Sequence, residues 1–317
     1  METTVLNQKT KKGTHGSQRV KDVKLSNEPS LKTGKEKFDN FFSKEGGLVI
    51  GSSCLLTGTS GAGKTTLMMN LMNWMPDVVI SLYEREVDAK DVCQQTKNIR
   101  PKHNNAYISD RKTCPHFNDY MNEIKTLKPS VIIIDSIQTM ALDFTPEMSE
   151  EAACNHISKE LREYCSDNGA VLFMVGHNLK DGDFAGANTL KQLVDSHLVM
   201  EFDKVKNERS ISFTKNRKGD VLKLYYAFES TGIEFYTEEE WKELSAEKNG
   251  NKLDFINSFA IFANGFISKI SPKHENYDEI ISEYNAGVKK LKKIEDGNML
   301  STKLLELVLE LSNKYEL

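Results

Sequence analysis

No run of about 18 apolar residues occurs in the sequence, so no ordinary membrane-spanning helix is expected. The N-terminus also lacks the apolar core of a secretory signal peptide. The five cysteines are scattered and form no C-x-x-C pair, so a disulfide framework is not expected. Together these absences favour a cytoplasmic protein that works in a reducing environment and has no membrane partner.

Enough apolar residues are present for a folded core. The 317 residues are 38% hydrophobic and 28% charged. This apolar fraction is too high for a wholly disordered chain, and the length corresponds to one large domain or two modest ones.

Positive charge is concentrated at the N-terminus. Residues 1–37 hold nine Lys and Arg against four Asp and Glu, although the whole chain has a formal net charge of −4. This segment shows no hydrophobic periodicity, so we predict a disordered basic tail over residues 1–37. Such a tail can bind a polyanion or remain solvated without a binding role. The rest of the chain is acidic, so charge alone does not indicate nucleic-acid binding.

Between residues 38 and 237, short apolar runs alternate with stretches of helical pattern. Continuous apolar strands separated by helices are typical of a buried parallel sheet. After about residue 209 the apolar runs are closely spaced, as in antiparallel hairpins. We therefore predict an α/β domain with a mostly parallel central sheet and an antiparallel extension. The expected strands are 53–57, 78–83, 131–135, 170–175 and 197–202, and the expected helices are 64–74, 87–97, 117–127 and 148–167.

Residues 238–317 have a mostly helical pattern and are predicted to form a small C-terminal helical region. The last segment is amphipathic. It can pack on the core or on a neighbouring subunit, or it can dock a partner protein. The apolar residues at helical spacing are Leu300, Leu304, Leu307, Val308 and Leu311.

A complete G-x-x-x-x-G-K-[ST] motif follows the first apolar strand and opens a helix. In this context the glycines let backbone N–H groups cradle phosphate oxygens, and the helix N-terminus favours negative charge. Lys64 is expected to reach the β- and γ-phosphates of ATP, and the Thr65 hydroxyl to ligate Mg²⁺. The predicted nucleotide-binding residues of this loop are Gly58, Thr59, Ser60, Gly61, Ala62, Gly63, Lys64, Thr65 and Thr66.

Two acidic positions complete the predicted ATPase site. Asp135 ends the apolar strand 131–135, where a carboxylate can hold Mg²⁺ beside the phosphate loop. Glu84 follows the strand 78–83, where a glutamate can position or deprotonate the attacking water. Glu86 lies two residues later and is the alternative candidate for that role.

Residues 38–220 resemble the ATPase core of the bacterial RadA/Sms proteins, which belong to the RecA superfamily. Residues 135–139 (DSIQT) match one motif of that family. The family's V-G-H-x-x-K-x-G-x-x-A-G motif is similar to residues 175–186 (VGHNLKDGDFAG). Residues 215–219 (KNRKG) resemble its K-N-R-F-G motif, with Lys218 at the position of the family's phenylalanine. The resemblance does not extend to the family's N-terminal zinc finger or its Lon-protease-like C-terminal domain.

This resemblance implies a RecA-like ATPase that forms a hexameric ring and hydrolyses ATP where subunits meet. Lys215 and Arg217 would then enter the neighbouring subunit's site as cations that neutralise charge on the γ-phosphate. A basic hairpin tip that faces solvent or contacts DNA is the alternative. His177 would sense the γ-phosphate and relay its state to the following loop.

The same resemblance implies single-stranded DNA as a partner. The loop from Asn178 to Leu190 is the expected DNA-facing segment, with Lys180, Asn188 and Lys191 as the predicted contacts. The leading hypothesis is a DNA-dependent ATPase of recombination or repair, with magnesium as its metal and a recombination or replication protein as a further partner. A DnaB-type replicative helicase core and a KaiC-like ATP-driven switch that does not bind DNA are the alternatives.

Overall fold

The computed structural model describes residues 28–177, 187–230, 232–245, 270, 272, 274–291 and 297–315. The chain divides into two compact units, Met1–Tyr236 and Thr237–Leu317. Among the described residues, no helix has the length and apolar character that a membrane span requires.

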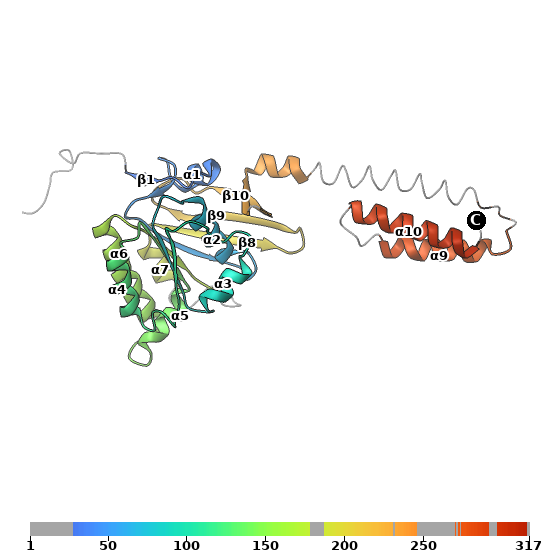
Figure 1. Ribbon diagram of the computed structural model, residues 1–317. Coiled ribbons are helices and arrows are strands. Elements are labelled where there is room, and N and C mark those ends of the chain that lie inside the picture. Colours follow the sequence, from blue (N-terminus) through green and yellow to red (C-terminus); the bar gives the residue numbers. More distant parts are fainter. Residues whose placement is uncertain are drawn as a thin grey trace, which may run out of the picture. The chain divides into compact units, whose positions relative to one another are not determined.

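A nine-stranded sheet forms the centre of the first unit, in the order β11-β10-β9-β8-β3-β7-β6-β4-β5 (Figure 1). The six strands from β8 to β5 are parallel, and β9, β10 and β11 continue the sheet in antiparallel pairs. This arrangement confirms the predicted α/β fold with its antiparallel extension. The parallel strands are β3 (Ser53–Gly58), β4 (Ile80–Glu84), β5 (Ala106–Ser109), β6 (Val131–Asp135), β7 (Val171–Val175) and β8 (Ser196–Asp203). The antiparallel strands are β9 (Glu208–Asn216), β10 (Lys223–Glu229) and β11 (Gly232–Tyr236).

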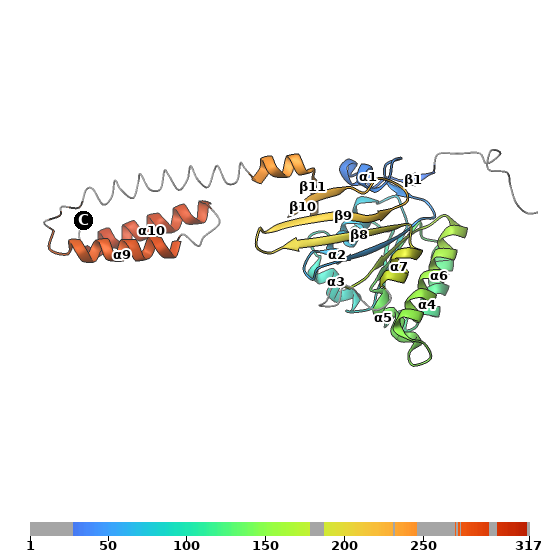
Figure 2. The same ribbon diagram turned by 180° about the vertical axis from the view of Figure 1, so that it is seen from behind.

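Two apolar cores cover the two faces of this sheet, because the central parallel strands are buried on both sides. One core packs α1 (Glu36–Phe42), α2 (Lys64–Trp74) and α3 (Ala89–Gln95) against the sheet. The other packs α4 (Phe117–Leu127), α5 (Ile137–Ala141), α6 (Glu150–Asn168) and α7 (Ala187–Leu193) against the opposite face (Figure 2). The 3₁₀ helix η2 (Leu142–Phe144) follows α5.

The N-terminal prediction is wrong for residues 28–37. There β1 (Ser30–Leu31) pairs with β2 (Leu48–Val49), and α1 begins at Glu36. The buried Asp39 carboxylate accepts hydrogen bonds from both the backbone N–H and the hydroxyl of Thr33. These contacts with the core order a polar segment that has no periodicity of its own. Residues 1–27 lie outside the described part of the chain.

Three short elements of the core were not predicted from the sequence. Strand β5 has only four residues and lies at the sheet edge, where it is partly exposed, so it carries no strong apolar run. Helix α5 has five residues, too few to show a helical period. Helix α7 begins at Ala187, so the predicted loop from Asn178 to Leu190 is helical over its last four residues. Its helical character was hidden by the neighbouring Gly- and Asp-rich sequence.

The second unit contains two helices that pack on each other. Residues 238–245 are helical and precede them in the chain. Helix α9 (Tyr277–Leu291) and helix α10 (Gly297–Tyr315) share a small apolar cluster that includes Ile280, Tyr284, Val308 and Leu311. An ion pair of 2.6 Å between Lys314 and Glu283 also joins them.

Candidate functional site

The phosphate loop joins β3 to α2 at the carboxyl end of the parallel strands. Gly58 has a φ of +145°, and a Cβ atom there would lie 1.9 Å from the carbonyl oxygen of Met200 on β8. Gly63, the residue before α2, has a φ of +95°. Only glycine accommodates such a close approach and such a backbone angle at low cost. Thr59, Ser60 and Gly61 form the exposed crest of the loop, and Ala62 is buried beneath it.

Lys64 begins α2 and turns back over the loop. Its ammonium donates a hydrogen bond of 3.1 Å to the carbonyl oxygen of Gly58. The side chain is mostly buried, and this burial lowers the pKa of Lys64 while the nearby carboxylates of Asp135 and Glu86 oppose the effect. The lysine ammonium is therefore held by the carbonyl oxygen of Gly58, the first residue of the phosphate-loop motif. Thr66 follows Thr65 in the first turn, and its carbonyl oxygen accepts a hydrogen bond from Asn70.

Thr65 and Asp135 meet at the end of the sheet. The Thr65 hydroxyl donates a hydrogen bond of 2.8 Å to a carboxylate oxygen of Asp135. Asp135 is 2% exposed, and burial raises its pKa, although the hydrogen bond from Thr65 and the charge of Lys64 favour the ionised form. A hydroxyl and a carboxylate side by side at a phosphate loop are oxygen ligands of the kind that Mg²⁺ takes.

Glu84 lies beside Asp135, because the two residues are register partners on β4 and β6. Its carboxylate accepts backbone hydrogen bonds from Glu86 and Val87. Burial, followed by the charge of Asp135, raises the pKa of Glu84 to about 7. A carboxylate with a pKa near neutrality is well matched to taking a proton from water.

Glu86 points to a different set of partners. Its carboxylate lies 2.8 Å from Nε2 of His177 and accepts a hydrogen bond of 3.0 Å from the Ser136 hydroxyl. The interaction with His177 is the main reason that the pKa of Glu86 is lowered. The backbone carbonyl of His177 accepts a hydrogen bond from Gln138, so His177, two residues after β7, is tied both to the segment that follows β4 and to α5. The pKa values of Glu84 and Glu86 are therefore shifted in opposite directions, and the two carboxylates contact different partners.

Strand β10 supports the phosphate loop, which the sequence motif alone did not reveal. The buried Tyr226 hydroxyl donates a hydrogen bond of 2.5 Å to the carbonyl oxygen of Ala62. The Phe228 ring covers Gly63, where a Cβ atom would lie 2.3 Å from it. The Arg209 guanidinium stacks between two phenylalanine rings. Its Cζ atom lies 4.9 Å from the centre of the Phe228 ring and 3.8 Å from the centre of the Phe202 ring. Aromatic residues on the antiparallel extension thus fix the loop from outside the parallel sheet.

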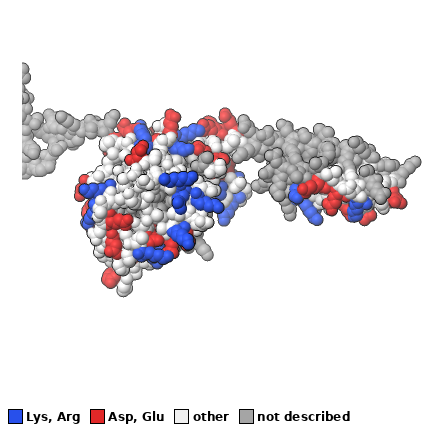
Figure 3. Space-filling model, viewed as in Figure 1, with Lys and Arg blue, Asp and Glu red and all other residues white. Residues whose placement is uncertain are grey.

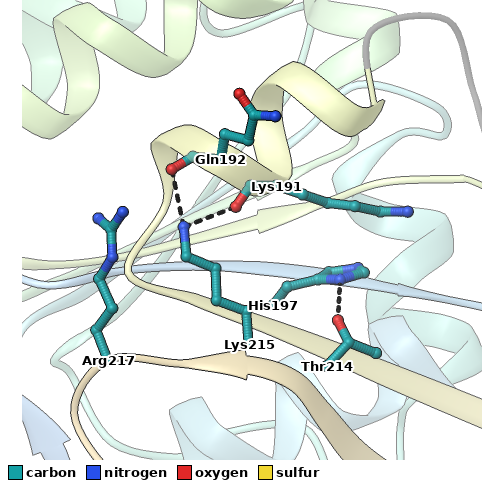
Figure 4. Close-up of a pocket in the computed structure, with 6 residues that line it drawn as sticks. All are labelled: Lys191, Gln192, His197, Thr214, Lys215 and Arg217. Atoms are coloured by element: carbon teal, nitrogen blue, oxygen red, sulfur yellow. Dashed lines mark hydrogen bonds between the residues drawn. The ribbon is translucent and has the colours of Figure 1, made fainter.

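Lys215 and Arg217 lie near a pocket of about 440 Å³ between α7 and the β8–β9 strands (Figure 4). The Lys215 ammonium donates hydrogen bonds to backbone carbonyls of Lys191, Gln192 and Val194 at the end of α7. Burial and the charge of Arg217 lower the pKa of Lys215. The Arg217 side chain is 55% exposed and lies 4.0 Å from the Asp195 carboxylate. The pocket is lined by Lys191, Gln192, His197, Thr214, Lys215 and Arg217, none of which belongs to the phosphate loop.

The predicted DNA contacts are only partly described. Lys180 lies outside the described residues, as do the other residues of 178–186. Asn188 is in the first turn of α7, but its side chain is outside the description as well. Lys191 is on α7 and lines the pocket. On the face of the core seen in Figure 3, basic side chains gather on the right-hand part, and basic and acidic side chains are interspersed elsewhere.

The residues present fit a magnesium nucleotide. The loop offers three glycines at positive φ and a lysine held by one carbonyl oxygen. Thr65 and Asp135 supply the oxygens for the metal, and Glu84 is the adjacent carboxyl group of near-neutral pKa. The predicted site residues from β3, α2, β4 and β6 therefore lie together, and Lys215 and Arg217 line a separate pocket.

Comparison with protein families and curated proteins identifies similar sequences. The model of a family described as an AAA domain matches residues 51–181. DNA repair protein RadA of Haemophilus influenzae is 29% identical over 210 residues, which cover 65% of this chain and 44% of that protein. RadA of Streptococcus pyogenes is 28% identical over 68% of this chain and 47% of its own length. RadA of Escherichia coli is 27% identical over 72% of this chain and 47% of its own length.

The chain therefore spans about half the length of the curated relatives it matches, and the match confirms the resemblance of its ATPase core to RadA. Among solved structures, a KaiC-like protein from Pyrococcus horikoshii has the same fold, with a TM-score of 0.55 and 20% identity. That match covers 66% of this chain and 99% of the archaeal one. The family and RadA matches support nucleotide binding and ATP hydrolysis by this core, and the KaiC-like structure supports its RecA-like fold.

Proposed function

We propose that this protein is a single-stranded-DNA-dependent ATPase that acts in recombination or repair, with ATP and Mg²⁺ as its cofactors. The observation that carries the ATPase part is the hydrogen bond from Thr65 to Asp135 beside Glu84. The similarity of the core to proteins named DNA repair protein RadA supports the DNA-repair part.

Each residue of the site has a task in this proposal. Lys64 leaves the Gly58 carbonyl and binds the β- and γ-phosphates, and Thr65 and Asp135 hold Mg²⁺. The bound metal neutralises phosphate charge. Glu84 accepts a proton from the attacking water, which its pKa of about 7 permits at neutral pH. His177, which contacts Glu86, senses the γ-phosphate at the start of the segment that leads to α7.

The proposal includes assembly of several copies into a ring, which we infer to be hexameric. Arg217 and Lys215 line a pocket that contains no phosphate-loop residue. They therefore act on the nucleotide held by a neighbouring copy, where an added cation accelerates phosphoryl transfer by roughly 10³–10⁵-fold. DNA is bound by Lys180, Asn188 and Lys191, repeated around the ring, and also by the basic N-terminal residues.

The test is ATP hydrolysis by the purified protein with and without single-stranded DNA. We expect single-stranded DNA to stimulate ATP turnover and added salt to weaken this stimulation. Lys64→Ala should abolish turnover both with and without DNA. Arg217→Ala mixed with Lys64→Ala is the matched test of assembly. The Arg217→Ala protein keeps Lys64 in its own phosphate loop, and the Lys64→Ala protein keeps Arg217 for the site of its neighbour. Rings that contain both variants should therefore recover part of the ATPase activity.

An ATP turnover rate that is the same with and without DNA would contradict the proposal and favour an ATP-driven switch. Unwinding of a replication fork, without activity on recombination intermediates, would instead favour a replicative helicase.

A further inference from the structure

Strand β9 contains an irregularity just before its two cations. The register pairs His197 with Lys215 and Leu198 with Phe213, so Thr214 is an extra residue that is skipped in the register with β8. Such a bulge reverses which face of the sheet the following side chains occupy. It therefore decides where Lys215 and Arg217 point.

The apolar residues of β9 show what the bulge changes. Ile211 and Phe213 are buried in the core that contains α1 and α2. With strict alternation, Lys215 would face that same apolar core. In the structure its ammonium instead reaches the carbonyls at the end of α7, on the opposite face. A charged side chain is thus removed from an apolar face and brought to the pocket.

His197 connects this bulge to the strand that leads into the phosphate loop. Its Nδ1 atom lies 2.5 Å from the Thr214 hydroxyl (Figure 4). Its Nε2 atom lies 2.9 Å from the Thr57 hydroxyl. The imidazole is 3% exposed and Thr57 is 2% exposed, whereas Thr214 lies at the pocket surface. Because a hydroxyl can donate or accept, both ring nitrogens are satisfied by these two partners. One buried side chain therefore spans three neighbouring strands, β3, β8 and β9.

We propose that His197 is a positioning residue for the interface cations. By holding Thr214 in the bulge, it fixes Lys215 and Arg217 toward the pocket. Its second hydrogen bond, to Thr57, connects the bulge to the residue that precedes Gly58 of the phosphate loop. The proposal rests on the proposed function insofar as Arg217 acts on the nucleotide of a neighbouring copy. The placement of the bulge does not depend on that activity.

Three substitutions at position 197 separate the two hydrogen bonds. His197→Leu removes both at similar volume. The amide of His197→Asn lies near the position of Nδ1 and can keep the bond to Thr214. The amide of His197→Gln lies near the position of Nε2 and can keep the bond to Thr57. Thr214→Val is the matched partner variant, because it removes the other half of the bond that holds the bulge.

Hydrogen exchange of the peptide that covers residues 211–218 is the first measurement, since it needs no catalysis. We expect faster exchange in His197→Leu and Thr214→Val, and exchange close to that of the wild type in His197→Asn. Unchanged exchange in His197→Leu overturns the proposal, whether or not the protein hydrolyses ATP. Restoration by His197→Gln but not by His197→Asn also overturns it.

Turnover then tests the link to Arg217. We expect His197→Leu to lower kcat by about five- to tenfold with nucleotide affinity unchanged, because only one of its two lost neutral hydrogen bonds, the bond to Thr214, holds the bulge. In a protein that already carries Arg217→Ala, adding His197→Leu should not lower kcat any further. An equal loss in both backgrounds overturns the positioning role. If Arg217→Ala alone leaves turnover intact, the role of Arg217 in the proposed function fails instead, and the exchange experiment still decides the placement of the bulge.

Discussion

The ammonium of Lys215 lies 2.8 Å from the carbonyl oxygen of Lys191, and this contact joins β9 to the last turn of α7. Two further carbonyls, from Gln192 and Val194, accept hydrogen bonds from the same ammonium. These oxygens belong to the helix end, where backbone carbonyls lack partners within the helix. A lysine there satisfies them and also interacts favourably with the helix dipole.

Lys215 and Arg217 should therefore differ in their effect on stability. We expect Lys215→Ala to lower the free energy of unfolding by about 1–3 kcal/mol, because it leaves several carbonyls unpaired. Arg217→Ala should change it by less than about 0.5 kcal/mol, because its side chain is half exposed. Urea unfolding of the two variants measures the difference. Equal effects would mean that the contact with α7 contributes little.

The raised pKa of Glu84 leads to a prediction of how ATPase activity depends on pH. A general base must be ionised, and the pKa of Glu84 is raised to about 7. Turnover should therefore rise between pH 6 and pH 8 and then level off, and Glu84→Gln should lower kcat by roughly 10²–10⁴-fold. Glu86→Gln is the matched control and should keep the rise with pH. If Glu86→Gln removes that rise, Glu86 is the base instead.

The same carboxyl group predicts an effect on stability. Because the folded protein disfavours its ionised form, the stability that Glu84 contributes is complete below its unfolded pKa and is lost as pH rises through about 7. Glu84→Gln removes this penalty. The variant should be more stable than the wild type at pH 8, by on the order of 2–3 kcal/mol, and gain nothing near pH 4. Thermal unfolding at the two pH values checks this, and an equal gain at both would contradict it.

The position of Asp135 beside Thr65 leads to a prediction of how ATPase activity depends on Mg²⁺ when Asp135 is replaced. Replacing it with asparagine keeps an oxygen near the Thr65 hydroxyl but removes the negative charge. We expect Asp135→Asn to need roughly 10–100-fold more Mg²⁺ for half-maximal turnover. Thr65→Ser is the control, because it keeps the hydroxyl and should keep the metal dependence. An unchanged Mg²⁺ titration for Asp135→Asn would exclude it as a metal-binding residue.

The sequence predicted the parts of the site that depend on local pattern. The phosphate loop and the acid that ends β6 can be recognised because each lies next to a continuous apolar strand. The direction of Lys215 could not be predicted, since it depends on a bulge that is defined only by pairing with β8. Nor could the role of His197 be seen, because Thr57 and Thr214 are distant from it in the sequence. Helix α7 (Ala187–Leu193) was missed because its seven residues show too little periodicity and follow a Gly- and Asp-rich sequence.

Tyr226 gives a prediction for the part of the site that lies outside the parallel sheet. Its hydroxyl is the partner of the Ala62 carbonyl in the phosphate loop, and both groups are buried. Tyr226→Phe leaves that carbonyl unpaired, which costs about 1 kcal/mol, and lets the loop depart from its phosphate-binding conformation. We therefore expect nucleotide affinity to fall by about fivefold, as measured by titration with a fluorescent ADP analogue.

Tyr225→Phe is the matched control for this measurement. It removes a hydroxyl from the adjacent residue, whose side chain lies on the other face of β10. Its affinity for the analogue should match that of the wild type. Equal affinity in both variants would show that the loop keeps its conformation without β10. A defect confined to Tyr226→Phe would make the antiparallel extension part of the nucleotide site.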